Sequence, residues 1–344
     1  THRTRSDIMY DHAMEPLRVG LIGLGWWGGV LAQKTGGAGV DIVSCFARTV
    51  ATRDDFAKAY TCSSASSVDE MLLDPDVEAV LVASPHSTHS DLVIRAAQAG
   101  KHVFCDKPFT LDVASGKRAM AATDAAGVVL QVGHNRRRQP GTRRLKHLID
   151  SGGLGTIVYA EANMSLPKEL TPRGGWRGNP AESPAGGMTG LGVHMADNLM
   201  YLLGRPSRVF AFSRQVLGRS DLDDVTTANL EFKSGPLAVL STSLVIPDIC
   251  RTAVWGIKAA AANEMDGAQF LFQATGEKGW ITQPIDEIDT VADELAEFAQ
   301  NVRNRTRPET GGPEALEVIA VLEGIVESAA TGQVVNLDEI RARE

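Results

Sequence analysis

The sequence has little of what marks a membrane, nucleic-acid or metal-binding protein. No apolar run reaches the roughly 18–20 residues of a membrane-spanning helix, so we expect no membrane partner. The formal charge of −8 argues against nucleic acid as a partner. The four cysteines show neither a CxxC pair nor metal-ligand spacing, which predicts no metal site, free thiols and a reducing cytoplasm. Residues 1–15 are polar and lack the apolar segment of a secretory signal, so we expect a flexible arm.

The first 130 residues alternate short apolar runs with amphipathic segments. The apolar runs are 17–25, 40–47, 78–84, 102–105 and 127–133. Segments with helical spacing lie at 51–60, 89–100 and 110–127, the last with Thr110 as its expected N-cap. This alternation predicts βαβ units and a parallel sheet that is covered on both faces.

The pattern changes after about residue 150. Period-two alternation, typical of half-exposed antiparallel strands, occurs at 156–166, 208–216, 226–235, 236–245 and 267–276. A final amphipathic helix is expected over 312–332. The second half is therefore expected to be α+β, built on a large and mostly antiparallel sheet. Because 344 residues are too many for one ordinary core, two domains are expected.

A glycine motif, Gly23-x-Gly25-x-x-Gly28, lies where the first predicted strand meets a helix. In this context it predicts a dinucleotide-binding turn: one glycine for the tight turn, one for close approach of a pyrophosphate, and one for helix packing. Trp26 and Trp27 fill the variable positions, and at least one is expected to cover the cofactor.

The end of the second predicted strand bears on which nicotinamide cofactor is used. A domain specific for NAD usually has an acidic residue here for the ribose 2′-hydroxyl. This chain has Arg48 and Thr49 instead, with Arg53 nearby. Arg48 can pair with a 2′-phosphate and stack on adenine, which favours NADP(H) over NAD(H). The alternative is that Arg48 is only a solvated loop residue.

Three further stretches, 84–112, 132–157 and 186–197, resemble together with the glycine motif the glucose–fructose oxidoreductase/inositol dehydrogenase family, called Gfo/Idh/MocA. The resemblance implies an N-terminal Rossmann domain, here 16–135, and a C-terminal α+β domain, here 136–344, whose final helix is free to pack back on the first. It also implies an open sheet face that forms a homodimer or homotetramer. The implied chemistry is hydride transfer between a nicotinamide and a sugar, polyol or related secondary alcohol.

The resemblance assigns roles to particular residues. The family's Glu-Lys-Pro is here Asp106-Lys107-Pro108, at the carboxyl edge of the parallel sheet where ligands bind in such folds. Lys107 is expected near the reacting oxygen, with a pKa lowered by burial, and His194 matches the catalytic histidine. The further residues that match cofactor-lining positions are Ser84, Pro85, His89, Asp106 and Asn135.

The expected substrate side contains one departure from the family. Its residues are Trp176, Arg177, Thr189, Gly190 and Asp197. In the polyol dehydrogenases an aspartate stands four residues before the histidine, whereas here that position is Gly190. The missing carboxylate suggests a larger, less polar pocket than a small polyol needs. Arg177 can serve the nicotinamide, an anionic substrate group or only the surface, and Arg136 and Arg137 can be site residues or structural ion-pair partners.

Three functions follow as hypotheses. The first is an NADP(H)-dependent oxidoreductase of a sugar-like or cyclic alcohol, with Lys107 and His194 handling the proton. The second is a dehydrogenase of a non-sugar substrate, such as an aromatic dihydrodiol or a cyclic hemiacetal. The third, supported only by Gly190, is a cofactor-binding protein that has lost catalysis.

Overall fold

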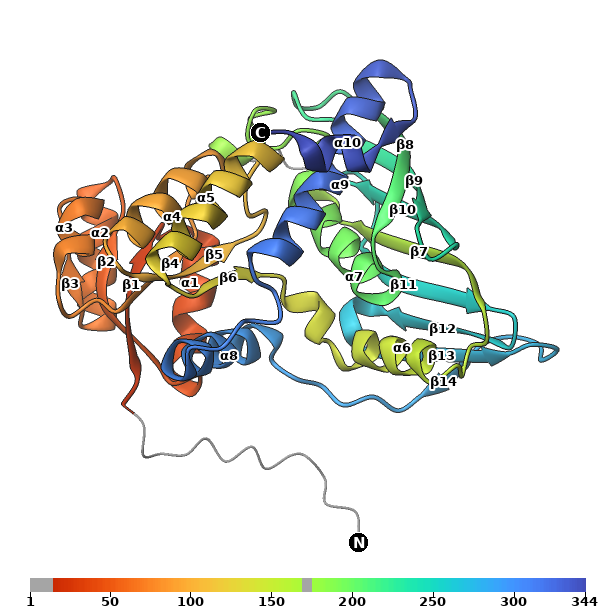
Figure 1. Cartoon of the computed structure of the whole chain (residues 1–344), viewed down its shortest axis with the longest axis horizontal. Coiled ribbons are helices and arrows are strands. Elements are labelled where there is room, and N and C mark those ends of the chain that lie inside the picture. The colour runs from red at the N-terminus through yellow and green to blue at the C-terminus, as the bar shows by residue number, and fades with distance from the viewer. Residues whose placement is uncertain (1–14, 169–174) are drawn as a thin grey trace, which may run out of the picture.

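The computed structural model describes residues 15–168 and 175–344, so residues 1–14 of the expected arm lie outside it. The chain forms two sheets side by side, joined by helices (Figure 1). The first sheet is six-stranded and entirely parallel, in the order β3-β2-β1-β4-β5-β6. Its strands are β1 (Leu17–Ile22), β2 (Val40–Phe46), β3 (Ser63–Ser64), β4 (Ala79–Val82), β5 (His102–Asp106) and β6 (Leu130–Gly133). The predicted parallel sheet is confirmed.

Both faces of this sheet are buried, because its strands are apolar on both sides. The helices of the first half are α1 (Trp26–Lys34), α2 (Val50–Tyr60), α3 (Val68–Leu73), α4 (His89–Gln98) and α5 (Val113–Ala126). Val103 and Cys105 of β5 pack on the α4–α5 side, whereas Phe104 packs on the opposite side. The N-cap of α5 is Asp112, which accepts from the Ser115 amide at 2.7 Å, and not the expected Thr110.

One helix from far along the chain completes this domain. The helices of the second half are α6 (Pro140–Asp150), α7 (Val193–Leu203), α8 (Thr290–Asn304), α9 (Gly312–Thr331) and α10 (Leu337–Ala342). Helix α8 lies beside α1 against the first sheet, where Leu295 and Phe298 join the core around Phe104 (Figure 1). Helix α9 runs between the sheets and contacts both α5 and β8. Among the described residues, no helix is long and apolar enough to cross a membrane.

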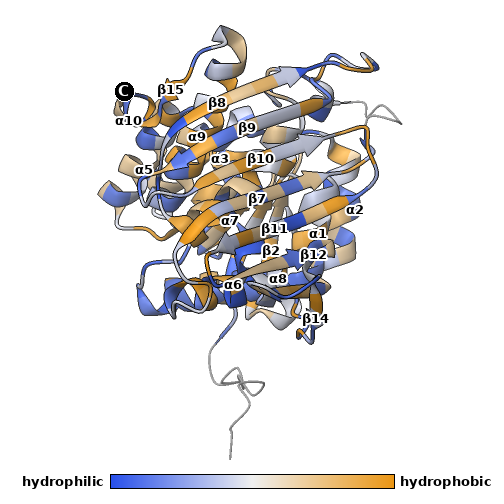
Figure 2. Ribbon diagram, turned by 90° about the vertical axis from the view of Figure 1, so that its right-hand side faces the viewer, coloured by the Kyte–Doolittle hydropathy of each residue, from blue (hydrophilic) through white to orange (hydrophobic). Residues whose placement is uncertain are grey.

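The second sheet has nine strands in the order β14-β13-β12-β11-β7-β10-β9-β8-β15. Its strands are β7 (Ile157–Ser165), β8 (Pro206–Arg214), β9 (Val225–Phe232), β10 (Leu237–Ser243), β11 (Ile249–Gly256), β12 (Ala259–Glu264), β13 (Gln269–Ala274), β14 (Ile281–Gln283) and β15 (Val335–Asn336). It is antiparallel except where β7 pairs with β10, which confirms the predicted sheet. The sequence did not suggest β11, β12 or the short strands β14 and β15. Helices α6, α7 and α9 lie on one face, and Figure 2 shows the other face open to the viewer.

Candidate active site

The glycine-rich turn between β1 and α1 is built for close backbone approach. Gly23 has a φ of +99°, and a Cβ there would lie 2.6 Å from the Ala83 backbone. A Cβ on Gly28 would lie 2.0 Å from the Gly23 carbonyl oxygen. A Cβ on Gly25 would meet nothing within 4 Å, so the turn packs tightly at Gly23 and Gly28 and has open space at Gly25.

The start of α1 leaves room and charge for a phosphate. Its N-cap is Gly25, and no side chain caps the free amide groups of the first turn. Such a helix start binds anions through its amides and dipole. Trp26, 70% exposed, and the half-buried Trp27 stand beside the turn with ring centroids 5.5 Å apart. These features fit the diphosphate of a dinucleotide, the cofactor that the motif predicts.

Arg48 follows β2 close to this turn. Its strand neighbour Phe46 accepts a hydrogen bond from the Gly23 amide at 3.0 Å, which fixes the end of β2 beside the glycines. Arg48 is exposed and forms no hydrogen bond or ion pair within residues 15–168 and 175–344. Arg53 differs, because its Nε donates to Ser64 Oγ at 3.0 Å. Thr49 is exposed at the start of α2.

A cavity of about 230 Å³ lies beyond the carboxyl ends of the parallel strands. Of the residues predicted for the site it is lined by Trp26, Trp27, Asp106, Lys107, Asn135, Arg136, Arg177, Gly190 and His194. Residues that the sequence analysis did not single out complete the wall, among them Met164, Leu166, Lys168, Leu191, Leu222 and Leu244. The predicted proton-handling residues therefore share one cavity with an apolar wall.

Lys107 reaches across this cavity. Its Nζ donates to the Gly190 carbonyl oxygen at 3.1 Å. Burial lowers the pKa of Lys107; the charge of Arg136 adds to this, while Asp106 opposes it. Burial also raises the pKa of Asp106, whose Oδ1 has no hydrogen-bond partner among the described residues. A lysine of lowered pKa is able to exchange a proton with a bound alcohol.

His194 is the second residue of α7, which follows directly on a π-helical turn at Met188–Gly192. Such turns are frequent at functional sites. The side chain is 5% exposed, and its Nδ1 has no hydrogen-bond partner among the described residues. Burial, with the nearby charge of Lys107, holds the pKa of His194 well below its usual range, so the ring is neutral. A neutral imidazole is able to accept a proton.

Gly190 opens the cavity, as its missing side chain suggests. It lies four residues before His194 and lines the cavity, and a Cβ there would meet nothing within 4 Å. The sole carboxylate in the cavity lining of the described residues is Asp106, against four cationic side chains.

A tether between the two halves holds one cavity wall. His86 donates from Nδ1 to the Glu182 carbonyl oxygen at 2.6 Å, and the Ser87 amide donates to the Glu182 carboxylate at 2.9 Å. Burial lowers the pKa of His86 to about 3. The Trp176 ring packs edge-on against His86, with Arg177 over its face at 4.2 Å. The role of Glu182 was not predicted, because nothing in its local sequence marks it.

The structure does not bring several predicted residues into the cavity. Asp197, predicted for the substrate, is 1% exposed and forms a buried ion pair with Arg137, whose Nε donates at 2.9 Å. Thr189 is 3% exposed and donates to the Pro184 carbonyl oxygen. Neither residue lines the cavity, because buried polar groups need partners and these have found theirs within the protein.

His89 braces loops and does not line the cavity. It is fully buried, with Nδ1 2.9 Å from the Pro108 carbonyl oxygen and Nε2 3.1 Å from that of Ser84. It thereby ties the loop after β4 to the loop after β5. Ser84 bonds to Thr88 through its hydroxyl at 2.7 Å, and Pro85 lies next to it on the same loop.

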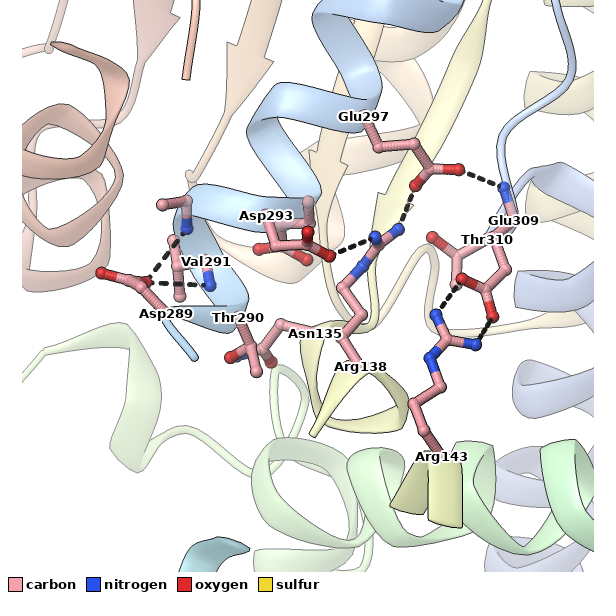
Figure 3. Close-up of polar contacts among 12 residues, drawn as sticks. Asn135, Arg138, Arg143, Asp289, Thr290, Val291, Asp293, Glu297, Glu309 and Thr310 are labelled. Atoms are coloured by element: carbon pink, nitrogen blue, oxygen red, sulfur yellow. Dashed lines mark hydrogen bonds and ion pairs between the residues drawn. The ribbon is translucent and has the colours of Figure 1, made fainter. Parts of the chain in front are cut away.

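The arginines after β6 are ion-pair partners. Arg136 pairs with Asp266 while still lining the cavity, and Arg138 pairs with Asp293 and Glu297 on α8. Asn135 donates to Thr290 Oγ1 at 2.9 Å, so the start of α8 is joined to the cavity wall (Figure 3).

Comparisons with known proteins agree with this architecture. Residues 17–134 match the oxidoreductase family described as GFO_IDH_MocA with an NAD-binding Rossmann fold, and residues 142–282 match the GFO/IDH/MocA C-terminal domain. The chain is 28% identical to the 1,5-anhydro-D-fructose reductase of Ensifer adhaerens over 89% of this chain and 93% of that protein. It is also 28% identical to the myo-inositol 2-dehydrogenase of Thermotoga maritima, over 94% and 99%.

Two solved structures superpose on nearly the whole chain. One is from Desulfitobacterium hafniense and carries the provisional name NADPH-dependent oxidoreductase; it has a TM-score of 0.90, 29% identity, and coverage of 96% of this chain and 100% of that one. The other is a levoglucosan dehydrogenase in complex with NADH and levoglucosan, with a TM-score of 0.86, 21% identity and coverage of 94% and 99%. At that identity the second shows the shared fold alone.

Proposed function

Because the chain belongs to the GFO/IDH/MocA family of NAD(P)-dependent oxidoreductases, we propose that it interconverts a secondary alcohol and a ketone on a sugar-like or cyclic substrate, with NADP(H). The observation that carries the proposal is the meeting of Lys107 and His194 in one cavity at the carboxyl end of the parallel sheet. When bound, the nicotinamide supplies the hydride acceptor or donor.

The chain's own residues transfer the proton and exclude water from the site. The Lys107 ammonium, held by the Gly190 carbonyl oxygen, donates to the substrate oxygen in reduction and, as an amine, takes its proton in oxidation. His194, neutral and buried, accepts a second hydrogen bond from the substrate or shares that proton. Leu166, Leu191 and the tryptophans exclude water from the reacting atoms.

Replacement of the two residues tests this proposal. We expect Lys107→Ala and His194→Ala each to reduce kcat by about 10²–10⁴-fold, because a positioned acid or base contributes that much. Cofactor affinity, measured by fluorescence titration, is expected to stay within a few-fold. Near-normal turnover in both variants would end the proposal, and cofactor binding without turnover in the wild type over a broad panel of alcohols would support the non-catalytic alternative.

The preference for NADP(H) rests on Arg48. Its exposed guanidinium, with no partner in residues 15–168 and 175–344, is available to a 2′-phosphate, and no acid stands nearby on the strand end to bind a 2′-hydroxyl. We expect Arg48→Ala to weaken NADPH binding at least tenfold and to leave NADH binding little changed. A wild type that prefers NADH, with no change in the variant, would contradict this.

The substrate is proposed to be bulkier or less hydroxylated than a small polyol. The open space at Gly190 and the wall of Met164, Leu222 and Leu244 support this. The same wall favours the second hypothesis, a dihydrodiol or hemiacetal substrate, to a similar degree. A panel of inositols, anhydrosugars and aromatic dihydrodiols, each compared by kcat/KM, separates the two.

Self-association is proposed through the open face of the second sheet. Aromatic side chains contact one another on its strands, Phe210 with Phe212 on β8 and Tyr159 of β7 with Trp255 of β11, and Leu237 of β10 is 58% exposed. Large exposed apolar patches mark interfaces. Light scattering of the wild type and of Phe212→Glu tests this, since a dimer or tetramer is expected to dissociate in the variant and a monomeric wild type would contradict it.

A further inference from the structure

Glu294 is a buried carboxyl group that the mechanism above leaves unused. It lies on α8 and is 1% exposed. Neither of its carboxylate oxygens has a hydrogen-bond partner among the described residues. Because a buried polar group without a partner is costly, such a group calls for a specific explanation.

The packing of α8 places Glu294 above the catalytic strand end. Phe298 of α8 packs on Phe104 of β5, with ring centroids 5.8 Å apart. Glu294 precedes Phe298 by one helical turn on the same face, and Asp106 follows Phe104 by two residues on the same face of the strand. One turn of α8 and two residues of β5 advance by similar lengths, so Glu294 lies over Asp106, whose charge acts on it. Gln131 of β6, aligned with Phe104, fixes this register by donating to the Glu294 carbonyl oxygen at 2.7 Å.

Other buried polar atoms near Glu294 also lack hydrogen-bond partners among the described residues. Besides Glu294, they include Asp106 Oδ1 and Gln131 Oε1. A buried seam of this kind, lined by polar atoms, is the setting in which internal water and shared protons occur.

Burial, more than the charged groups that face Glu294, favours its protonated form. Burial raises the pKa of Glu294 well above its usual range. The charges of Asp106 on β5 and Glu297 on α8 add to this, whereas Arg138 after β6 and Lys107 oppose it.

Two carboxylates close to Glu294 on α8 reach solvent. Arg138 pairs with Asp293 at 2.9 Å and with Glu297, one residue before and three after Glu294 (Figure 3). The side chain of Asp293 is 44% exposed, and that of Glu297 is 23% exposed. Solvent therefore reaches the far end of this carboxylate row.

We propose that Glu294 relays protons between Lys107 and solvent through Asp106. The proposal rests on the proposed function, in which oxidation of one alcohol releases one proton while the hydride goes to the nicotinamide. In that direction the Lys107 ammonium gives its proton to Asp106. Because neither carboxyl oxygen of Glu294 has a partner among the described residues, internal water carries the proton from Asp106 to one oxygen of Glu294, and Glu294 releases its own proton from the other oxygen, again through water, toward Asp293 and Glu297. Each group returns to its initial protonation state. In reduction, a proton follows the same path from solvent to Lys107. Glu294 touches neither substrate nor cofactor in this scheme, so it acts through Asp106 and Lys107.

The test compares Glu294→Gln, which keeps the shape but cannot relay, with Glu294→Asp, which retains a carboxyl group. Glu309→Gln is the matched control, because it breaks an ion pair with Arg143 near α8 and keeps the backbone amide through which residue 309 donates to Glu297 at 2.8 Å. We expect Glu294→Gln to lower kcat roughly tenfold or more at unchanged KM and cofactor affinity, and to raise the solvent deuterium isotope effect on kcat. Glu294→Asp is expected to restore most of kcat, and Glu309→Gln to match the wild type.

A second readout needs no turnover. Infrared spectra of the protein without substrate are expected to show the carbonyl stretch of a buried carboxylic acid, lost in Glu294→Gln and kept in Glu309→Gln. If Glu294→Gln does not fold, the wild-type and Glu294→Asp spectra decide the same point. A wild-type kcat and solvent isotope effect in Glu294→Gln, or the absence of that infrared band in the wild type, would overturn the relay. The proposed function stands or falls separately, on Lys107→Ala and His194→Ala.

Discussion

A carboxylate placed at position 190 is expected to shift the pH dependence of the reaction. The Cβ of Gly190→Asp would meet nothing within 4 Å, and the position lines the cavity, so the new side chain has open space to enter. The new group enters the cavity one helical turn before His194 and beside Lys107, whose Nζ is 3.1 Å from the Gly190 carbonyl oxygen. Its negative charge favours the protonated forms of both.

The size of the shift follows from Coulomb's law. Two unit charges about 5 Å apart interact by about 3 kcal/mol at an effective dielectric constant of about 20. That energy corresponds to about 2 pKa units. The cost of burying the new carboxylate removes part of it, so we expect the pKa of Lys107 or His194 to rise by about 1 unit.

The assay is the pH profile of kcat/KM for alcohol oxidation, which needs a deprotonated base. A raised pKa moves the acidic limb of that profile to higher pH, by about 1 unit for Gly190→Asp. Gly190→Asn is the matched control, since it has the same size and no charge, and its profile should overlay that of the wild type. Coincident profiles for the aspartate and asparagine variants would refute the assignment of Lys107 and His194 as the proton-handling pair at this cavity.

Two further predictions concern the cofactor turn and the buried ion pair. Gly28→Ala places a Cβ 2.0 Å from the Gly23 carbonyl oxygen, so we expect it to displace the turn and to lower the free energy of unfolding by about 1–3 kcal/mol. We also expect it to weaken NADPH binding at least tenfold in fluorescence titrations. Gly29→Ala, whose Cβ meets nothing within 4 Å, is the control, and equal NADPH affinities of the two variants would contradict the expectation. Arg137→Ala strips the buried Asp197 of its counterion and is expected to lower the free energy of unfolding in urea by about 3–5 kcal/mol at pH 7. Burial alone would raise the pKa of Asp197, but Arg137 more than offsets this and holds it below the usual range, so the pair stabilises the fold above about pH 4 and less as pH falls. The difference in the free energy of unfolding between the wild type and Arg137→Ala should therefore be smaller in acid than at pH 7. An equal difference in acid and at pH 7 would count against the ion pair as its source.

Local patterns in the sequence carried much of the fold. Apolar runs and glycines predicted the parallel sheet, since buried strands and tight turns leave short-range signals. The family resemblance at the motifs around Lys107 and His194 implied that the two side chains act together, and both line one cavity. The open position at Gly190 was also visible from the sequence, because a missing side chain leaves a space that only unusual packing could fill.

The rest depended on partners far apart in the chain. Arg137 and Asp197 are 60 residues apart, and no local pattern distinguishes a carboxylate that binds substrate from one that neutralises an arginine. Glu182 was missed for the same reason, since it gains its role only when it meets Ser87 across 95 residues. Strand β12 gave no clear alternation, because Ala259, Ala261 and their neighbours are buried on both faces. Strand β11 gave none either, since its middle residues are buried in succession and the residues at its ends are all half-exposed.

The position of α8 limits how this protein can be divided. Residues 290–304 come late in the chain, yet they cover the sheet face around Phe104 and stand over the carboxyl end of β5. A fragment that ends near residue 150 would contain every predicted cofactor contact but would expose that apolar face to water. The cofactor-binding half is thus not a transferable module, and chimaeras that exchange the second half among relatives must exchange or redesign α8 with it. Substitutions in the two halves are constrained in the same way, because a residue changed on β5 alters the packing of α8, which lies almost 200 residues later in the chain.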